Sequence, residues 1–218
     1  MRLRPEFGET LPQLLRRRYG IPERRSWLGA GVVVVLLVVA FLLVHDPLDG
    51  KAQLVHRSTP VFNTLYTPGA VRPAKPRAGE LQRYVGRRGP LRVEVAVRRL
   101  RLPPYQGDLA GALPVFATAH ADRLAARLPG FEPTDEGRAR VGGAPGYQVG
   151  FRFGPPGDRT TGRDVLVIPP EEPGARDGVV ITYRETRGGV QPGARTRAVL
   201  KGARSAFRSF KFGDDRDD

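Results

Sequence analysis

The sequence predicts an α+β fold, in which an N-terminal transmembrane helix precedes a mostly antiparallel sheet packed with two helices. The first observation is one uncharged block of 18 residues, 27–44, close to the length that crosses a bilayer. The second is a series of short alternating or apolar segments, typical of strands, with two amphipathic helical segments among them. The third is their order, because only one helix separates the first strands from the rest. That order disfavours a doubly wound nucleotide-binding fold.

Composition excludes several classes of chemistry. The 218 residues include 36 basic and 22 acidic side chains, for a net charge of +14, and no cysteine. Without cysteine there is no disulfide framework, thiolate nucleophile, Cys-ligated zinc or lipid-modified cysteine. Residues 1–26 carry +4 and residues 45–218 carry +10, while residues 27–44 carry no charge. The basic surplus outside the apolar block favours association with anionic surfaces.

Five segments follow from these patterns. We expect a basic cytoplasmic tail with a short helix, a transmembrane helix, a linker, an extracytoplasmic α+β domain and an acidic disordered tail. Their residue ranges are, in that order, 1–26, 27–44, 45–60, 61–213 and 214–218.

The uncharged block is expected to stay in the membrane as an anchor. In lipid a helix is favoured even for valines, because it satisfies every backbone polar group within one segment. A cleaved signal peptide has an apolar region of only about 7–15 residues and a small-residue cleavage site, which the sequence does not offer here. The anchor residues are Trp27, Leu28, Val32, Val33, Val34, Val35, Leu36, Leu37, Val38, Val39, Phe41, Leu42, Leu43 and Val44.

The flanking charges predict the orientation. Arginines close to one end of a span mark its cytoplasmic side, and five precede the block: Arg16, Arg17, Arg18, Arg24 and Arg25. We therefore expect a single-pass protein of the cell membrane with its N-terminus in the cytoplasm. Residues 10–13, Thr-Leu-Pro-Gln, have the spacing of a capping box. The short helix that follows is either a docking element, a basic patch on anionic lipid, or only a topology signal.

The first half of the outer domain shows two strand patterns and a helix. Residues 61–66 are apolar and β-branched, and residues 72–90 are rich in Pro, Arg and Gly, which predicts a long surface connection. Residues 91–98 alternate cleanly, so one face is expected to be packed and the other wet. The following helix is expected to have Pro114 in its first turn and one apolar face. That face comprises Leu113, Phe116, Ala117, His120, Leu124 and Leu128.

The second half predicts four more strands and a second helix. A glycine-rich turn at residues 142–146 follows a short strand at 138–141. Continuous apolar runs bounded by Gly, Pro and charge are typical of central strands. Central strands are expected at residues 165–168 and 179–183, and a half-buried strand at residues 147–153, where apolar and other residues alternate. The second helix carries Val199, Leu200, Ala203, Ala206, Phe207 and Phe210, and residues 210–212 close as a short strand.

Three short motifs stand out: Phe62-Asn63-Thr64-Leu65-Tyr66-Thr67-Pro68-Gly69, Gly143-Ala144-Pro145-Gly146-Tyr147, and Ala203-Arg204-Ser205-Ala206-Phe207-Arg208-Ser209-Phe210-Lys211-Phe212. They resemble PsbP-like domains, the superfamily that includes photosystem extrinsic proteins and LpqN-type actinobacterial envelope proteins. The resemblance covers about 150 residues and implies an antiparallel sheet between helices, an α/β/α sandwich, with no shared catalytic residues. Ala70 departs from it, since a bulky aromatic often follows the first Pro-Gly. LpqN-type proteins are usually lipoproteins, so here a helical anchor would replace the lipid. The Arg-rich, Lys-poor composition is also typical of a high-GC actinobacterium.

No recognised catalytic or metal-binding pattern appears, and no cofactor is expected. The four serines lie in no Gly-x-Ser-x-Gly or Ser-x-x-Lys motif, and the three histidines have no metal spacing. His120 is interpreted as a hydrogen-bonded histidine at the core boundary. The acidic pairs Asp135-Glu136 and Glu171-Glu172 are interpreted as solvated loops.

The predicted function is therefore non-enzymatic binding by a membrane-anchored envelope protein. Membrane lipid is one expected partner, and the outer domain is expected to bind an envelope protein, an apolar ligand or an anionic lipid or polymer. Nucleic acid is not expected, because no aromatic-interleaved basic motif is present. Two alternatives remain: an assembly subunit of a membrane complex, and a hydrolase with an unrecognised site. A buried carboxylate pair, or His120 against a carboxylate in a cleft, would favour the hydrolase.

Overall fold

The computed structural model describes residues 17–18, 31–37, 51–58, 60–103, 105, 107–170, 177–189 and 193–213. The chain divides into two compact units, Met1–Pro47 and Leu48–Asp218.

In the first unit, residues 17–18 and 31–37 are helical. The six apolar side chains from Val32 to Leu37 are exposed, each at 55–63%. None of the helices in the described residues is long and apolar enough to cross a membrane. Most of the predicted anchor, the predicted capping box and all the topology arginines except Arg17 and Arg18 lie outside the described residues.

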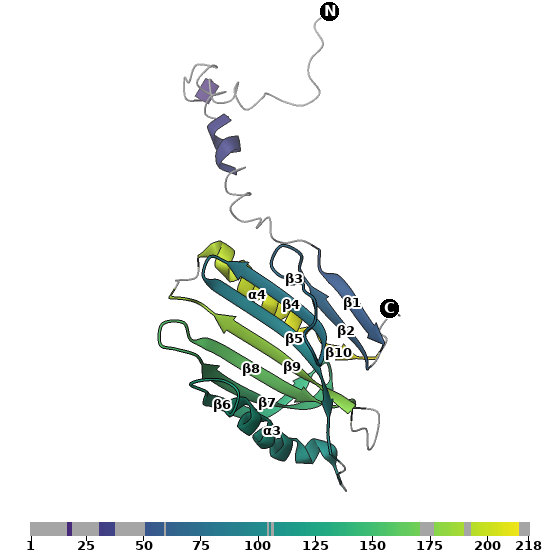
Figure 1. Ribbon diagram of the computed structural model, residues 1–218. Helices are drawn as coiled ribbons and strands as arrows, with labels where there is room; N and C mark the ends of the chain where they lie inside the picture. Colours follow the sequence, from purple (N-terminus) through teal and green to yellow (C-terminus); the bar gives the residue numbers. More distant parts are fainter. Residues whose placement is uncertain are drawn as a thin grey trace, which may run out of the picture. The chain divides into compact units, whose positions relative to one another are not determined.

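The second unit contains ten strands and two helices in its described residues (Figure 1). The strands are β1 (Gln53–Ser58), β2 (Val61–Tyr66), β3 (Arg72–Pro73), β4 (Glu80–Arg88), β5 (Leu91–Arg101), β6 (Glu132–Val141), β7 (Ala144–Phe153), β8 (Thr160–Val167), β9 (Asp177–Thr186) and β10 (Lys211–Phe212). The helices are α3 (Leu109–Ala125) and α4 (Ala194–Arg208).

The strands form two antiparallel sheets. Seven strands pair in the order β3-β4-β5-β9-β8-β7-β6, and three in the order β1-β2-β10. Every pairing is antiparallel, which confirms the predicted antiparallel α+β class. The predicted strand at 210–212 is also confirmed, since β10 pairs with β2 through Phe212 and Phe62.

The helices cover opposite faces of the large sheet. Successive side chains of a strand point to opposite faces, and β9 shows the division: Val180 belongs to the core under α3, while Val179 and Ile181 lie on the other side. The α3 core includes Leu113, Leu124, Phe151 and Leu166. The α4 core includes Tyr84, Val93, Val95, Val199 and Ala203. The continuous apolar run in β9 is therefore the part of that strand that is packed on both faces.

Two segments expected to lack regular structure contain strands. The predicted linker at 45–60 contains β1, so the sheet begins earlier than expected. The predicted surface connection at 72–90 contains β3 and β4. In β4 the alternation is obscured because Gln82 and Arg83 are buried and a register shift lies between Glu80 and Gln82. A strand with buried polar side chains lacks the apolar pattern from which strands are predicted.

Three further boundaries differ from expectation. Helix α3 begins at Leu109 rather than near Pro114, because Asp108 caps it by accepting hydrogen bonds from the amides of Ala110 and Gly111. Strand β6 begins at Glu132, so Asp135 and Glu136 lie on a strand and not in a loop. The predicted turn at 142–146 is only two residues long: Gly142 and Gly143 have φ of 55° and 84°, as a type I′ hairpin turn requires.

Candidate functional site: a basic hollow on the sheet

Helix α3 covers only part of its face of the large sheet, and the uncovered part is polar. On β5 the side chains on this face are Arg92, Glu94, Ala96 and Arg98, because Leu91, Val93, Val95 and Val97 lie on the α4 side. On β9 the corresponding residues are Thr182, Arg184 and Thr186, which are paired with Ala96, Glu94 and Arg92. The clean alternation of residues 91–98 thus predicts the two faces correctly, but the polar face is a concave surface with buried charges.

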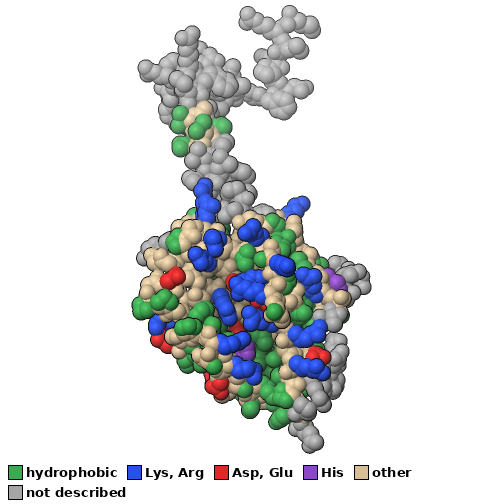
Figure 2. Space-filling view, in the orientation of Figure 1, with side chains coloured by type: hydrophobic (Ala, Val, Ile, Leu, Met, Phe, Trp, Pro, Cys, Tyr) green, Lys and Arg blue, Asp and Glu red, His purple; other side chains and the backbone are tan. Residues whose placement is uncertain are grey.

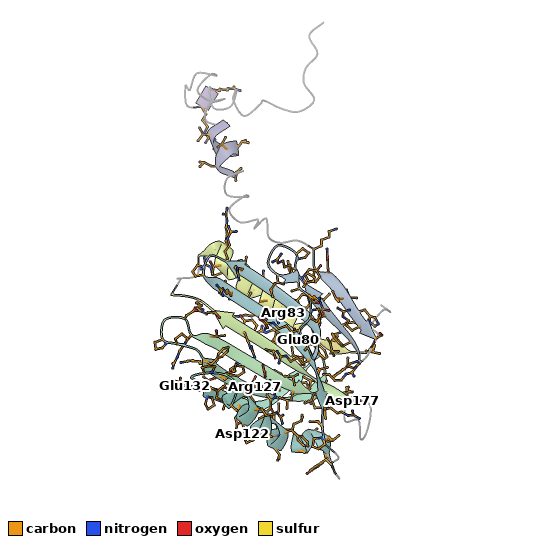
Figure 3. All side chains as sticks on the ribbon, viewed as in Figure 1. Glu80, Arg83, Asp122, Arg127, Glu132 and Asp177 are labelled. Carbon is orange, nitrogen blue, oxygen red and sulfur yellow. The ribbon has the colours of Figure 1, made fainter. Side chains whose placement is uncertain are left out.

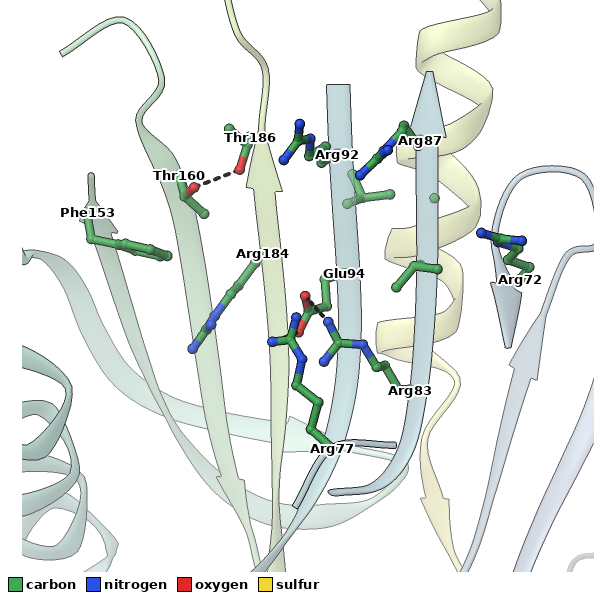
Figure 4. A pocket seen from close by; sticks show the side chains of 13 residues that line it. Arg72, Arg77, Arg83, Arg87, Arg92, Glu94, Phe153, Thr160, Arg184 and Thr186 are labelled. Atoms are coloured by element: carbon green, nitrogen blue, oxygen red, sulfur yellow. Dashed lines mark hydrogen bonds and ion pairs between the residues drawn. The ribbon is translucent and has the colours of Figure 1, made fainter. Parts of the chain in front are cut away.

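This surface is hollowed, with a volume of about 460 Å³. Figure 2 shows Lys and Arg side chains gathered around the hollow over the large sheet. Figure 4 shows its lining from close by. Six arginines and one carboxylate are among the lining residues, which are Arg72, Arg77, Arg83, Val85, Gly86, Arg87, Arg92, Val93, Glu94, Phe153, Thr160, Arg184 and Thr186.

Arg83, which lines the hollow, and the neighbouring Arg98 are paired with the carboxylates of Glu80 and Glu94. Arg83 Nη1 lies 3.1 and 3.2 Å from the two carboxylate oxygens of Glu80, and its Nη2 pairs with Glu94. Arg98 Nη2 donates to Glu80 at 3.1 Å. The Glu80 side chain is fully buried and that of Arg83 is 6% exposed. Figure 3 shows Glu80 and Arg83 close together on β4, the strand next to the β3 edge of the sheet.

Glu80 is ionised despite its burial. Burial by itself raises the pKa of this carboxyl, but the hydrogen bond from the Arg77 amide and the charges of Arg83 and Arg98 outweigh it. The pKa of Glu80 therefore lies below its usual value. A buried carboxylate that accepts several charge-assisted hydrogen bonds is a fixed structural element.

The outer arginines have no such partners. Within the described residues, Arg72, Arg87, Arg92 and Arg184 form neither an ion pair nor a hydrogen bond through their guanidinium groups. Arg87 and Arg92 are also paired directly opposite each other on β4 and β5. Like charges in directly opposite positions destabilise a sheet, so this pair is unfavourable unless an anion lies between them.

Arg184 is the most deeply placed of the four. Its Nε is buried without a hydrogen-bond partner, and its guanidinium lies over the Phe153 ring, 5.5 Å from the centroid. Burial lowers the pKa of Arg184, although the nearby carboxylates of Asp164 and Glu94 oppose that effect. In Figure 4 the side chain lies between Phe153 and Glu94. A half-buried guanidinium without a partner is a ready donor for a ligand anion.

Neutral side chains complete the wall toward β7. The hydroxyl groups of Thr160 on β8 and Thr186 on β9 form a hydrogen bond of 2.7 Å. Phe151 lies over Gly162, where an added Cβ would meet ring carbon Cε2 at 2.2 Å. Gly162 lies within β8, where it leaves room for this ring.

His120 lies on α3 and contacts β8. Its Nε2 is 2.7 Å from Asp164 Oδ2, and Asp164 is 2% exposed with its second oxygen unpartnered. This is the hydrogen-bonded boundary histidine that the sequence predicts. The hydrolase alternative requires His120 to contact a carboxylate in a cleft. The contact is present, but His120 and Asp164 do not line the hollow.

A second basic surface lies on the solvent side of α4, which contains no acidic residue. It is a depression of about 640 Å³ lined by Arg197, Leu200, Lys201, Arg204, Ser205, Arg208 and Ser209. The acidic contact there is Glu185, 3.8 Å from Arg204. Ser205 and Ser209 also line this depression, and the Ser209 hydroxyl accepts a hydrogen bond from the Leu65 amide and donates one to the Leu65 carbonyl.

The sequence reading did not identify the hollow. Within the described residues no group of three or more His, Asp or Glu could hold a metal ion. The signal was present as Arg92, Glu94 and Arg98 on one face of a strand and Arg184 on another. The register that places these strands side by side could not be read from the sequence.

Comparisons with known proteins give structural similarity only. No protein-family model matches the chain, and no curated protein matches it. Among solved structures, the chain is similar to LpqN of Mycobacterium tuberculosis, described as involved in cell envelope biogenesis, at 17% identity and a TM-score of 0.45, covering 78% of this chain and 88% of LpqN. It is similar to the PsbP of Synechocystis sp. PCC 6803 at 12% identity and a TM-score of 0.45, covering 78% and 96%. A Pseudomonas aeruginosa protein of unknown function matches at 15% identity and a TM-score of 0.34, covering 63% and 83%. These include the two groups that the sequence motifs resemble.

Proposed function

We propose that this chain is a single-pass, membrane-anchored envelope protein whose α+β domain binds an anionic ligand in the basic hollow, without chemically altering it. One observation carries the proposal: Arg83 is neutralised by Glu80 and Glu94, while Arg72, Arg87, Arg92 and Arg184 line the same hollow with no ion pair among the described residues. Unpaired like charges held together are unfavourable in the free protein. An anion in the hollow removes that repulsion and gains charge-assisted hydrogen bonds.

The anchor part of the proposal is supported by residues 31–37. They form a helical segment with the apolar side chains of Val32 to Leu37 exposed. Exposed apolar helix surface is unfavourable in water and favourable in lipid. The arginines before the segment favour a cytoplasmic N-terminus, which would place the hollow outside the cell membrane.

The binding claim is tested with the full-length chain in phosphatidylcholine nanodiscs. Acetate, citrate and inorganic phosphate are titrated by calorimetry at constant ionic strength. We expect at least one of them to bind, and Arg184→Gln to weaken that binding about tenfold or more, because a hydrogen bond to a charged group contributes about 1.5–3 kcal/mol.

The matched control is Arg140→Gln, which removes the same charge from an exposed position on β6 outside the hollow. It should change the affinity less than twofold. The proposal is rejected if no anion binds, or if Arg140→Gln weakens binding as much as Arg184→Gln does.

The contact between His120 and Asp164 favours hydrolysis as a second candidate. A histidine held by a buried carboxylate is the base arrangement of nucleophilic hydrolases. The test is turnover of p-nitrophenyl acetate and p-nitrophenyl phosphate by the full-length chain and by His120→Gln. Turnover that disappears in the variant would support a hydrolase; a rate equal to buffer alone would reject it for these two classes of ester.

A further inference from the structure

We infer that the outer face of α4 lies against the surface of an anionic lipid bilayer. Four exposed basic side chains of this helix form the α4 stripe: Arg197, Lys201, Arg204 and Arg208. This inference goes beyond the proposed ligand site, since α4 and the hollow belong to opposite faces of the large sheet. It relies on the proposed function only for the anchor that keeps the domain near a membrane.

Helical geometry places the four charges on one line. They are spaced by four, three and four residues, which at 3.6 residues per turn keeps them within an arc of about 60°. The α4 stripe is about 17 Å long at a rise of 1.5 Å per residue. A flat surface beside the helix therefore contacts all four side chains at once, and α4 contains no acidic residue that would interrupt the stripe.

Most of the α4 stripe lacks counter-charges among the described residues. Arg204 lies 3.8 Å from Glu185. In contrast, Arg197, Lys201 and Arg208 form no ion pair with any other described residue. Like charges four residues apart destabilise a helix. An anionic surface removes this repulsion and supplies the missing negative charge.

The chemistry of this face favours lipid headgroups over a protein partner. Protein interfaces have an apolar or aromatic centre and are depleted in Lys. Among the described residues that line the depression on α4, the one apolar residue is Leu200, and it is buried in the core. None of the large apolar side chains that are exposed in the described residues belongs to α4. The helix therefore has no apolar surface to insert between acyl chains, as an interfacial amphipathic helix has, and its contact is electrostatic.

A short connection keeps the domain close to the expected membrane anchor. Eight residues, 45–52, separate the uncharged block from the start of β1 at Gln53. A fully extended chain of this length spans at most about 30 Å. A domain tethered at that distance meets the bilayer at high effective concentration, so even a weak electrostatic contact is populated.

Contact through α4 determines which way the hollow faces. The hollow lies on the face of the large sheet that carries α3, opposite α4. With the α4 stripe on the lipid, the hollow opens away from the bilayer. Its ligand then arrives from solution and not from the lipid of the same membrane.

The contact is tested by energy transfer in the full-length chain. The sequence has no cysteine, so Ser205→Cys, at an exposed position beside the α4 stripe, gives one site for a donor dye. The chain is placed in nanodiscs with an acceptor dye on a fraction of the headgroups. The lipid is phosphatidylcholine alone, or phosphatidylcholine with about one third phosphatidylglycerol. We expect more energy transfer with phosphatidylglycerol. Raising NaCl from about 0.1 M to about 1 M should abolish the difference, because the Debye length falls from about 10 Å to about 3 Å.

Two double variants locate the contact. Arg197→Gln combined with Lys201→Gln should lower the ratio of lipid-bound to free domain about 25-fold, because each cation near an anionic surface contributes about fivefold. The matched control is Arg123→Gln combined with Arg127→Gln. It removes two charges at the same spacing from exposed positions at the end of α3, on the opposite face of the sheet. It should change the ratio less than twofold.

Equal energy transfer in the two lipid compositions, or equal losses in the two double variants, would overturn the inference. Binding of the α4 stripe to soluble polyglutamate without a response to phosphatidylglycerol would assign the stripe to an acidic protein and overturn it as well. A chain that is not retained in phosphatidylcholine nanodiscs has no anchor. The same measurement with added vesicles of the two compositions then decides the α4 contact. Anion binding in the hollow is measured separately by calorimetry in phosphatidylcholine nanodiscs, so a failure of the proposed ligand site is distinguished from a failure of the α4 contact.

Discussion

Arg83 and Arg184 lie on the same face of the same sheet and have opposite surroundings. Arg83 is held by Glu80 and Glu94, whereas Arg184 approaches the carboxylates of Asp164 and Glu94 without an ion pair to either within the described residues. A buried ion pair whose hydrogen bonds are made holds its geometry, but removing one partner leaves a charge that is expensive to bury. The first arrangement suits a scaffold, and the second suits a site that is completed by a ligand.

Glu80→Gln should lower the free energy of unfolding by about 3 kcal/mol at pH 7, because it leaves Arg83 and Arg98 short of their shared buried partner. The folded-state pKa of Glu80 lies below the ordinary value of 4.5. Its contribution is therefore complete above that value and is lost as the pH falls through the folded pKa. Urea unfolding of both proteins from pH 7 to pH 3 measures this difference.

The control for Glu80 is Glu132→Gln. Glu132 also pairs with an arginine, Arg159, but its side chain is 52% exposed, and exposed pairs contribute about 0–1 kcal/mol. The difference in the free energy of unfolding between the wild type and Glu80→Gln should become smaller as the pH falls. If it stays constant down to pH 3, the folded state does not stabilise the ionised form of Glu80.

Arg184→Gln should have the reverse effect on the free protein. Burial disfavours the charge of Arg184, and the carboxylates of Asp164 and Glu94 offset that cost only in part, since neither forms an ion pair with it among the described residues. The free energy of unfolding without ligand should therefore stay unchanged or rise by up to about 1 kcal/mol. Chemical unfolding in phosphate-free buffer measures it. A loss of more than 1 kcal/mol would show that Arg184 is part of the scaffold.

At the scale of single elements, β8 shows how one glycine leaves room for an aromatic ring of the α3 core. Gly162→Ala places a Cβ against the Phe151 ring, whose side chain is fully buried. Overpacking of this kind costs about 1–3 kcal/mol, which thermal unfolding would detect. Gly137→Ala on β6 is the matched control, since nothing lies within 4 Å of its added Cβ. If the two variants have the same midpoint of thermal unfolding, the Phe151 ring moves aside without loss of stability.

The start of α3 depends on Asp108, which accepts hydrogen bonds from the amides of Ala110 and Gly111 at 3.0 and 3.1 Å. Asp108→Ala should destabilise the domain by about 1 kcal/mol. Asp122→Ala removes the same group from an exposed position later in α3, outside the first turn, and should cost less. If both variants unfold at the same denaturant concentration, the cap does not fix the start of the helix.

Elements with clear periodicity could be predicted from the sequence, and those with buried polar residues could not. Strands β2, β5 and β9 and the core faces of α3 and α4 follow from their apolar patterns. Strand β4 was missed because two buried polar residues interrupt its apolar pattern: Gln82, which accepts a hydrogen bond from Arg57, and Arg83, which lines the hollow. The hollow depends on three long-range facts, namely the β4-β5-β9 pairing, its register and the limited cover by α3. None of these is a local property of the chain.

At the scale of the whole molecule, the charges and the apolar block divide the chain into three parts of different composition. The net charge of +14 is carried by residues 1–26 and 45–218, and residues 27–44 carry none. Five arginines immediately before this block favour retention of the N-terminus in the cytoplasm, because positive charge close to a span is translocated poorly. A long folded domain translocates largely regardless of its charge. The basic domain with its hollow is therefore expected outside.

The topology can be tested with protease added to intact spheroplasts that express the chain with an epitope at each end. We expect the C-terminal epitope to disappear and the N-terminal epitope to survive on a short membrane-bound fragment, because the bilayer shields one side from the enzyme. Replacing all five arginines (Arg16, Arg17, Arg18, Arg24 and Arg25) by Gln should weaken the preference for a cytoplasmic N-terminus. In part of the molecules the C-terminal domain would then be protected from the protease. Detergent lysis before protease is the control, and both epitopes should then be lost. A protected C-terminal epitope in the unmodified chain, or a chain that remains in the supernatant after membranes are sedimented, would contradict the anchor. In either case the hollow would meet cytoplasmic or soluble anions instead of those of the envelope.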